Sequence, residues 1–201
     1  MNLEKWEQRY GTLEYFYGTD PNDLLRQRCD SIRLGGTVLC LAEGEGRNAV
    51  FLAGQGYQVT AVDQSVAGLA KAERLAAQRG VSIVTALADL ADYPMGSACW
   101  DGIVSIWCHL PRGLRADVHR RAIEALTPGG VFLLETYTPA QLAHHTGGPR
   151  SADLLPTLEQ LQGELVGLEL VHAVECERMV HEGSGHDGLS AVVQIVAIKG
   201  E

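Results

Sequence analysis

The stretch Val38-Leu39-Cys40-Leu41-Ala42-Glu43-Gly44-Glu45-Gly46-Arg47-Asn48-Ala49 decides the fold of this chain. Its first four residues form a short apolar run that predicts a buried strand, and a helix is expected over residues 47–52. Gly44 and Gly46, between the two, let the backbone approach a ligand at the N-terminus of that helix. We therefore expect a strand, a glycine-rich loop and a helix here, with a ligand site at the loop.

Strands and helices alternate beyond this unit. Ser65 can cap a helix that Gly80 stops, and apolar residues at helical spacing predict another helix over residues 114–126. Parallel strands need such crossover helices, so the strands between them predict a parallel sheet. These further strands are expected at residues 57–62, 81–87, 102–107 and 131–134.

The C-terminal part of the chain follows a different pattern. Residues 168–180 and 189–198 are two long strand-like runs joined by the glycine-rich stretch 182–188, which predicts an antiparallel hairpin. The expected fold class is α/β: a Rossmann-like, doubly wound sheet of seven strands, mostly parallel, with a C-terminal antiparallel hairpin. We expect one domain over residues 1–201, in which residues 1–34 form a helical arm or lid.

Composition and charge argue against several classes of protein. The 201 residues are 46% hydrophobic and 20% charged, as in an ordinary soluble globular domain. No apolar stretch approaches the roughly 20 residues that cross a bilayer, and the N-terminus lacks a secretory signal, so we expect a cytoplasmic protein without a membrane partner. A net charge of −9 argues against nucleic acid as a partner. The five cysteines are odd in number and lack C-x-x-C spacing, which predicts free thiols.

The charges on the glycine-rich loop distinguish between two ligands. Gly44-x-Gly46-x-x-Ala49 fits the dinucleotide fingerprint, with Asp63 near the expected distance to hold a ribose. A dinucleotide would place its pyrophosphate beside Glu43 and Glu45, which would repel it. S-adenosylmethionine has no phosphate and carries a sulfonium and an ammonium group, so it tolerates these carboxylates. The loop favours S-adenosylmethionine; an NAD(P)-dependent oxidoreductase and a non-catalytic S-adenosylmethionine-binding module remain the alternatives.

Two aspartates follow the second and third predicted strands. Asp63 can accept hydrogen bonds from both ribose hydroxyls, or it can cap a turn or helix. Asp89, followed by Leu90, can accept a hydrogen bond from the exocyclic amine of adenine, or it can cap the turn that follows. Both stand at the carboxyl edge of the sheet, where ligands of such folds bind.

Several segments resemble successive motifs of class I S-adenosylmethionine-dependent methyltransferases: residues 38–53, 59–65, 88–90, 100–110 and 126–135. Within that class, three motifs resemble the tellurite-resistance methyltransferases and their bacterial relatives. They are Trp6-x-x-Arg9-Tyr10, Tyr15-Phe16-Tyr17-Gly18-Thr19-x-Pro21-Asn22 and Gly44-x-Gly46-Arg47-Asn48. The resemblance implies that Gly44 and Gly46 lie under the methyl donor, that Asp63 holds its ribose, and that Asp89 and Leu90 hold its adenine.

Two positions depart from the class. An aspartate or glutamate commonly stands where this chain has Cys40, and a glycine where it has Ala42. Because a thiol cannot replace the contacts of a carboxylate, the group that orients the amino-acid end of the donor is left open. The predicted donor-binding residues are Glu43, Gly44, Glu45, Gly46, Arg47, Asp63, Gln64, Ser65, Asp89, Leu90 and Ser105.

The acceptor is predicted to be a small, soft nucleophile such as a chalcogen oxyanion or a thiol. Positioning supplies much of the catalysis of methyl transfer, and a general base is needed only if the acceptor must lose a proton. The candidates for the catalytic side are His109, Tyr17 and His186. Arg47 or Arg178 could add positive charge for an oxyanion, although a solvated surface position is expected for each. The histidine spacing matches no common metal site, so no metal is expected, and the oligomeric state is left open.

Overall fold

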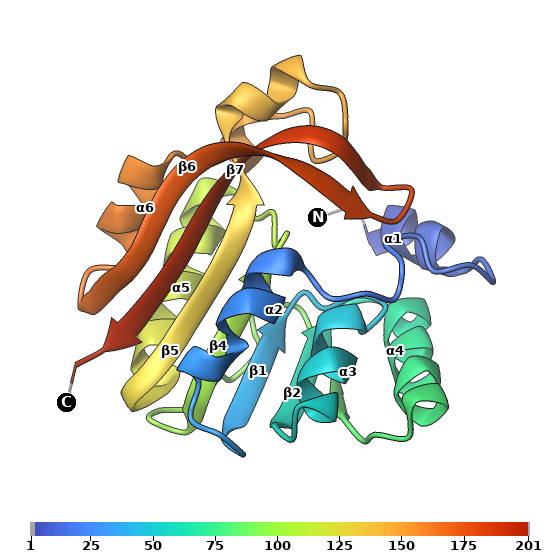
Figure 1. Cartoon of the computed structure of the whole chain (residues 1–201), viewed down its shortest axis with the longest axis horizontal. Helices are drawn as coiled ribbons and strands as arrows, with labels where there is room; N and C mark the ends of the chain where they lie inside the picture. Colours follow the sequence, from blue (N-terminus) through green and yellow to red (C-terminus); the bar gives the residue numbers. More distant parts are fainter. Residues whose placement is uncertain (1–2, 201) are drawn as a thin grey trace.

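The computed structural model describes residues 3–200, and its centre is one seven-stranded sheet (Figure 1). The strands are β1 (Thr37–Leu41), β2 (Gln58–Asp63), β3 (Val84–Leu87), β4 (Trp100–Ile106), β5 (Leu126–Tyr137), β6 (Leu168–Glu182) and β7 (His186–Lys199). Their order is β3-β2-β1-β4-β5-β7-β6. The first five pair in parallel, and β7 pairs antiparallel with both β5 and β6. The predicted fold class is confirmed.

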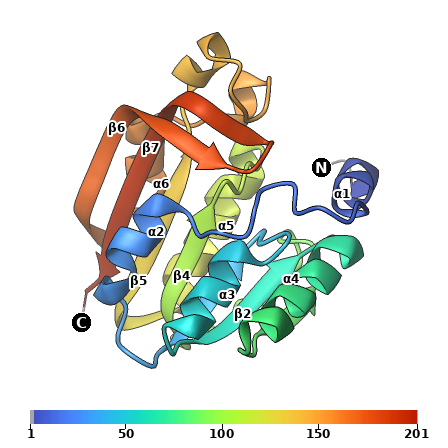
Figure 2. The same cartoon turned by 45° about the vertical axis from the view of Figure 1, so that its right-hand side comes forward.

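Helices cover both faces of the sheet (Figure 2). On one side lie α2 (Asp23–Arg28), α3 (Arg47–Gly54) and α4 (Val66–Arg79), and on the other lie α5 (Arg112–Ala125) and α6 (Leu158–Glu164). Alternation along β1 divides the core accordingly. Val38 and Cys40 pack with Leu52 of α3, whereas Leu39 and Leu41 pack in the cluster that α5 and α6 complete. Short 3₁₀ helices lie at Cys29–Ser31, Pro139–Ala143 and Ala152–Leu154.

The C-terminal hairpin is tighter than expected. Glu182 already pairs with His186, so only residues 183–185 form the turn, in place of the predicted loop 182–188. Likewise, β5 begins at Leu126 because that residue pairs with Trp100 ahead of the apolar run. Backbone pairing with a neighbouring strand extends these strands beyond the hydrophobic pattern that predicts them.

The N-terminal arm consists of two parts with different surroundings. Helix α1 (Leu3–Tyr10) lies beside α4, and the chain then crosses the carboxyl edge of the sheet to reach α2 (Figure 2). In α2, Leu24 and Leu25 are buried in the core, so only the segment before α2 can serve as a lid. Within residues 3–200, no helix is both long and apolar enough to cross a membrane. All five cysteines are free.

Candidate functional site

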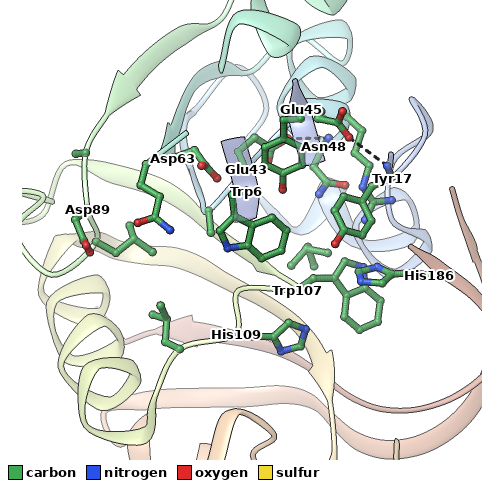
Figure 3. A pocket seen from close by; sticks show the side chains of 18 residues that line it. Trp6, Tyr17, Glu43, Glu45, Asn48, Asp63, Asp89, Trp107, His109 and His186 are labelled. Atoms are coloured by element: carbon green, nitrogen blue, oxygen red, sulfur yellow. Dashed lines mark hydrogen bonds between the residues drawn. The ribbon is translucent and has the colours of Figure 1, made fainter. Parts of the chain in front are cut away.

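A pocket lies at the carboxyl ends of the parallel strands, the edge predicted to bind the ligand (Figure 3). Its lining combines aromatic and apolar side chains with a few carboxylates, which is typical of pockets for small molecules. From the sheet side it is lined by Ala42, Glu43, Glu45, Arg47 and Asn48 after β1, Asp63 and Gln64 after β2, Ala88, Asp89 and Leu90 after β3, and Ile106, Trp107, His109 and Leu110 around the end of β4. Trp6, Tyr10 and Tyr17 of the arm and His186 of the hairpin complete it.

The loop after β1 places a carboxylate on the N-terminus of α3. Glu43 Oε1 accepts hydrogen bonds from the backbone N–H groups of Asn48 (2.9 Å) and Ala49 (2.7 Å). N–H groups at this position bind the pyrophosphate in a dinucleotide site, so here a carboxylate of the chain occupies that place. Burial raises the pKa of Glu43 to about 7, although the two N–H groups oppose the shift. This arrangement argues against NAD(P) as the ligand.

The two departures from the class have different structural outcomes. Ala42 lines the pocket with φ +50°, in the left-handed region that favours glycine, which costs on the order of 1 kcal/mol. Cys40 is fully buried in the core. Burial, and then the neighbouring Glu43, raise the pKa of its thiol well above the ordinary value. Cys40 is therefore a neutral core residue that lies behind the pocket wall.

Glu45 does not present a second free carboxylate, because a lysine neutralises it. Its Oε1 lies 2.7 Å from Lys71 Nζ of α4, and both side chains are buried. Its Oε2 accepts a hydrogen bond from the backbone N–H of Tyr17 (3.2 Å). Glu45 thus connects the glycine-rich loop to α4 and to the arm.

Asp63 and Asp89 lie in the pocket, and each also has a local structural role. Asp63 Oδ2 accepts a hydrogen bond from the Gly44 N–H (2.9 Å) and Oδ1 one from the Ser65 N–H (2.8 Å); burial raises its pKa. Asp89 is exposed, and its Oδ1 accepts a hydrogen bond from the Ala91 N–H (2.9 Å), which caps the turn. Carboxylate oxygens have further lone pairs, so ribose and adenine contacts stay predictions that this geometry permits.

Of the other predicted donor-binding residues, Arg47, Gln64 and Leu90 line the pocket but Ser65 and Ser105 do not. The Ser65 hydroxyl accepts the Gly68 N–H as the N-cap of α4. Ser105 is buried within β4. Their positions next to pocket residues in the sequence do not bring their side chains into the wall.

The two loop glycines serve the packing of helices against the loop, and neither lines the pocket. A Cβ atom on Gly44 would lie 2.7 Å from the Tyr10 hydroxyl, and one on Gly46 would lie 2.5 Å from Ala72 Cβ. Both glycines have positive φ. They let α1 and α4 approach the loop closely.

The arm contributes more to the pocket than predicted. Tyr17 lines it, as expected, and Trp6 and Tyr10 of α1 do so too. The Trp6 and Tyr10 rings stack with centroids 5.5 Å apart, and Arg9 Nη1 donates a hydrogen bond to the Tyr17 hydroxyl (2.6 Å). The sequence contains a signal for the two missed residues, because aromatic residues four positions apart share one helix face.

His109 and His186 come together on the side of the pocket opposite Asp89 (Figure 3). His109 stacks on Tyr137, and His186 contacts the rings of Tyr17 and Trp107 at centroid distances of 4.6 and 4.8 Å. Burial, and then the nearby His186, lower the pKa of His109 to about 3. Burial also lowers the pKa of His186. Both rings are therefore neutral at pH 7 and weakly basic.

A buried charged network supports this side of the pocket. Glu182 of β6 accepts hydrogen bonds from the Trp107 indole, from Asn22 and from the guanidinium groups of Arg47 and Arg178. The solvated surface position expected for the two arginines is therefore wrong. Arg47 is buried, and Arg178 also binds the fully buried Glu135 (2.6 Å). Arg47 binds Glu182 and Arg178 binds Glu135, partners far away in the sequence, so the local sequence does not reveal these positions.

Comparison with known proteins supports the same ligand. Residues 38–130 match the family described as "Methyltransferase domain", and no curated protein matches the chain. Among solved structures, the N-methyltransferase NodS from Bradyrhizobium japonicum WM9 in complex with S-adenosyl-L-homocysteine is 15% identical, with TM-score 0.72 over 99% of this chain and 98% of that one. TehB from Haemophilus influenzae is 20% identical, with TM-score 0.71 over 98% of this chain and 66% of that one.

A third similar structure comes from work on the conversion of a disulfide bond into a thioacetal group during echinomycin biosynthesis. It is 18% identical, with TM-score 0.79 over 100% of this chain and 93% of that one. At these identities the similar structures establish only the fold. The family match covers residues 38–130, which include the glycine-rich loop. Together with Glu43, which occupies the N–H groups that would bind a pyrophosphate, they support an S-adenosylmethionine-dependent methyltransferase.

Proposed function

We propose that the enzyme transfers the methyl group to a small, soft nucleophile, a thiol or a chalcogen oxyanion. The observation that carries this proposal is the chemistry of the acceptor side of the pocket, by which we mean the side formed by Tyr17, His109 and His186. It offers aromatic faces and two neutral imidazoles. His109 has a pKa of about 3, and the pKa of His186 is also lowered, in each case first by burial. A base of such low pKa removes a proton from an amine or phenol poorly at pH 7.

Three other charged groups that line the pocket are bound to partners within the chain, Glu43 through one of its two oxygens. Glu43 binds the N-terminus of α3, Glu45 pairs with Lys71, and Arg47 pairs with Glu182. An acceptor whose lone pair is available without help from the protein therefore suits this site best. Thiolates and the oxyanions of selenium and tellurium have such lone pairs.

In this proposal the enzyme acts by positioning. Bound S-adenosylmethionine supplies a methyl group that its sulfonium has already activated, and the rings of Tyr17, His109 and His186 hold the acceptor in line with it. The closed arrangement of arm and hairpin keeps water from the reacting atoms. The same enclosure favours a small-molecule partner over a nucleic acid or a membrane.

The subfamily resemblance supports this choice of acceptor. The motifs that resemble tellurite-resistance methyltransferases meet in the structure: the Asn22 backbone N–H donates to Asn48 Oδ1 (2.9 Å), and Tyr17 binds Arg9. We place the enzyme within this subfamily and, consistent with its five free thiols, in the cytoplasm. One similar structure concerns sulfur chemistry, whereas NodS is an N-methyltransferase, so amines are the competing acceptors.

The test is methyl transfer from labelled donor to tellurite, selenite, a panel of alkyl thiols, small amines and phenols. We expect the labelled methyl group on tellurium, selenium or sulfur, and little product from amines or phenols. Methylation confined to amines or phenols would contradict the proposed acceptor class and would leave the methyltransferase assignment intact.

A further inference from the structure

One carboxylate oxygen in the pocket has no assigned use. Glu43 is largely buried, and its Oε1 accepts both hydrogen bonds from the N-terminus of α3. Within residues 3–200, no hydrogen bond or ion pair involves its Oε2, although the residue lines the pocket. Glu43 Oε2 is not among the buried atoms without a partner, so it is accessible, and its free lone pairs can accept a hydrogen bond from a ligand in the pocket.

The position of Glu43 along the pocket indicates which part of the ligand meets it. Asp89, Asp63 and Glu43 follow β3, β2 and β1, which are neighbours in the sheet. Figure 3 shows the three carboxylates following one another across the pocket, with Tyr17 and His186 at the end away from Asp89. With the adenine at Asp89 and the ribose at Asp63, the amino-acid end of the donor lies over the loop after β1.

The nearby charges single out Glu43 as the acceptor for a cation at that end. Glu45 is neutralised by Lys71, and Arg47, whose charge lowers the pKa of Glu43, is paired with Glu182. Cys40, at the end of the same strand, is a neutral thiol in the core. Glu43 is thus the carboxylate on this loop that still has an oxygen available.

We propose that Glu43 Oε2 binds the α-ammonium group of the methyl donor while Oε1 holds the N-terminus of α3. The carboxylate connects the start of that helix to the amino-acid end of the ligand. This inference concerns the donor only and does not depend on the identity of the acceptor.

The test compares two ligands that differ by one group. S-adenosylhomocysteine and its deamino analogue, in which hydrogen replaces the α-amino group, are titrated calorimetrically into the full chain. A hydrogen bond to a charged group corresponds to about 10- to 150-fold in affinity, so we expect the deamino analogue to bind that much more weakly. In Glu43→Gln the two ligands should bind within about threefold of each other, because S-adenosylhomocysteine alone loses affinity.

Two further variants keep the test decisive. Glu43→Asp retains a carboxylate and should restore part of the preference for the amino group, even if the amide variant folds poorly. Glu73→Gln, an exposed glutamate of α4 that binds Thr85, should keep the full preference. Equal binding of the two ligands by the parent protein, or an undiminished preference in folded Glu43→Gln, would overturn the proposal.

Discussion

Replacing Glu182 tests whether the buried charged network holds the acceptor side of the pocket. Burial alone would raise the pKa of Glu182, but contacts with His186, Arg47 and the Trp107 indole hold it well below the ordinary value. Removing one partner of a buried ion pair costs about 3–5 kcal/mol, because the other charge stays buried without compensation. Glu182→Ala leaves the buried Arg47 without its partner, so we expect the free energy of unfolding to fall by about 3–5 kcal/mol. Glu182→Gln keeps an acceptor oxygen and should cost less, about 1–3 kcal/mol.

Chemical denaturation measures the stability, and titration with S-adenosylhomocysteine and steady-state kinetics measure the site. We expect kcat/KM for the acceptor to fall more than donor affinity, because Glu182 contacts Trp107 and lies 3.9 Å from His186. Glu177, exposed on the same strand and paired with His144, gives the matched control. Its Gln variant should lose no more than about 1 kcal/mol. If Glu182→Ala is no less stable than the Glu177 control, the network does not support the pocket.

Three further predictions concern the donor side, the arm and the response to pH. Asp63→Ala should weaken S-adenosylhomocysteine binding by about 1.5–3 kcal/mol. Asp89→Asn should weaken it less, because an amide oxygen still accepts hydrogen bonds. If calorimetry finds the affinity unchanged in both variants, the donor does not bind at this edge of the sheet. Gly183 has a φ of +67°, and the Cβ of Gly183→Ala would lie 2.4 Å from the Phe16 carbonyl oxygen. We therefore expect faster proteolysis of the arm and weaker donor binding in this variant. If neither changes, the hairpin turn does not hold the arm in place. Burial raises the pKa of Glu43 from 4.5 to about 7, so ionisation of this carboxyl group lowers the free energy of unfolding. The loss is absent below pH 4.5 and complete above pH 7. The Tm of Glu43→Gln minus that of the parent should therefore increase from pH 5 to pH 8, and a flat difference would contradict the raised pKa.

Much of the donor site could be predicted from the sequence, because loops at the carboxyl ends of parallel strands lie at one edge of the sheet. Glu43, Asp63 and Asp89 follow three such strands, and all three line the pocket. Of the other predicted residues, Gly44, Gly46, Ser65 and Ser105 do not line the pocket: the Ser65 side chain caps α4, and Ser105 is buried in β4. A position in the sequence identifies the edge, but the direction of a side chain depends on the local backbone.

The sequence by itself determined the succession of strands and helices along the chain and the position of the glycine-rich loop. It also favoured S-adenosylmethionine, which has no phosphate, over a dinucleotide. These features follow from hydrophobic period, turn residues and local charge, which act over a few neighbouring positions. Only the tertiary structure decided the state of each charge: Glu45 is neutralised by Lys71, and Arg47 is buried against Glu182. The partners in these pairs are far apart in the chain, so their electrostatics exist only once the sheet brings distant segments together.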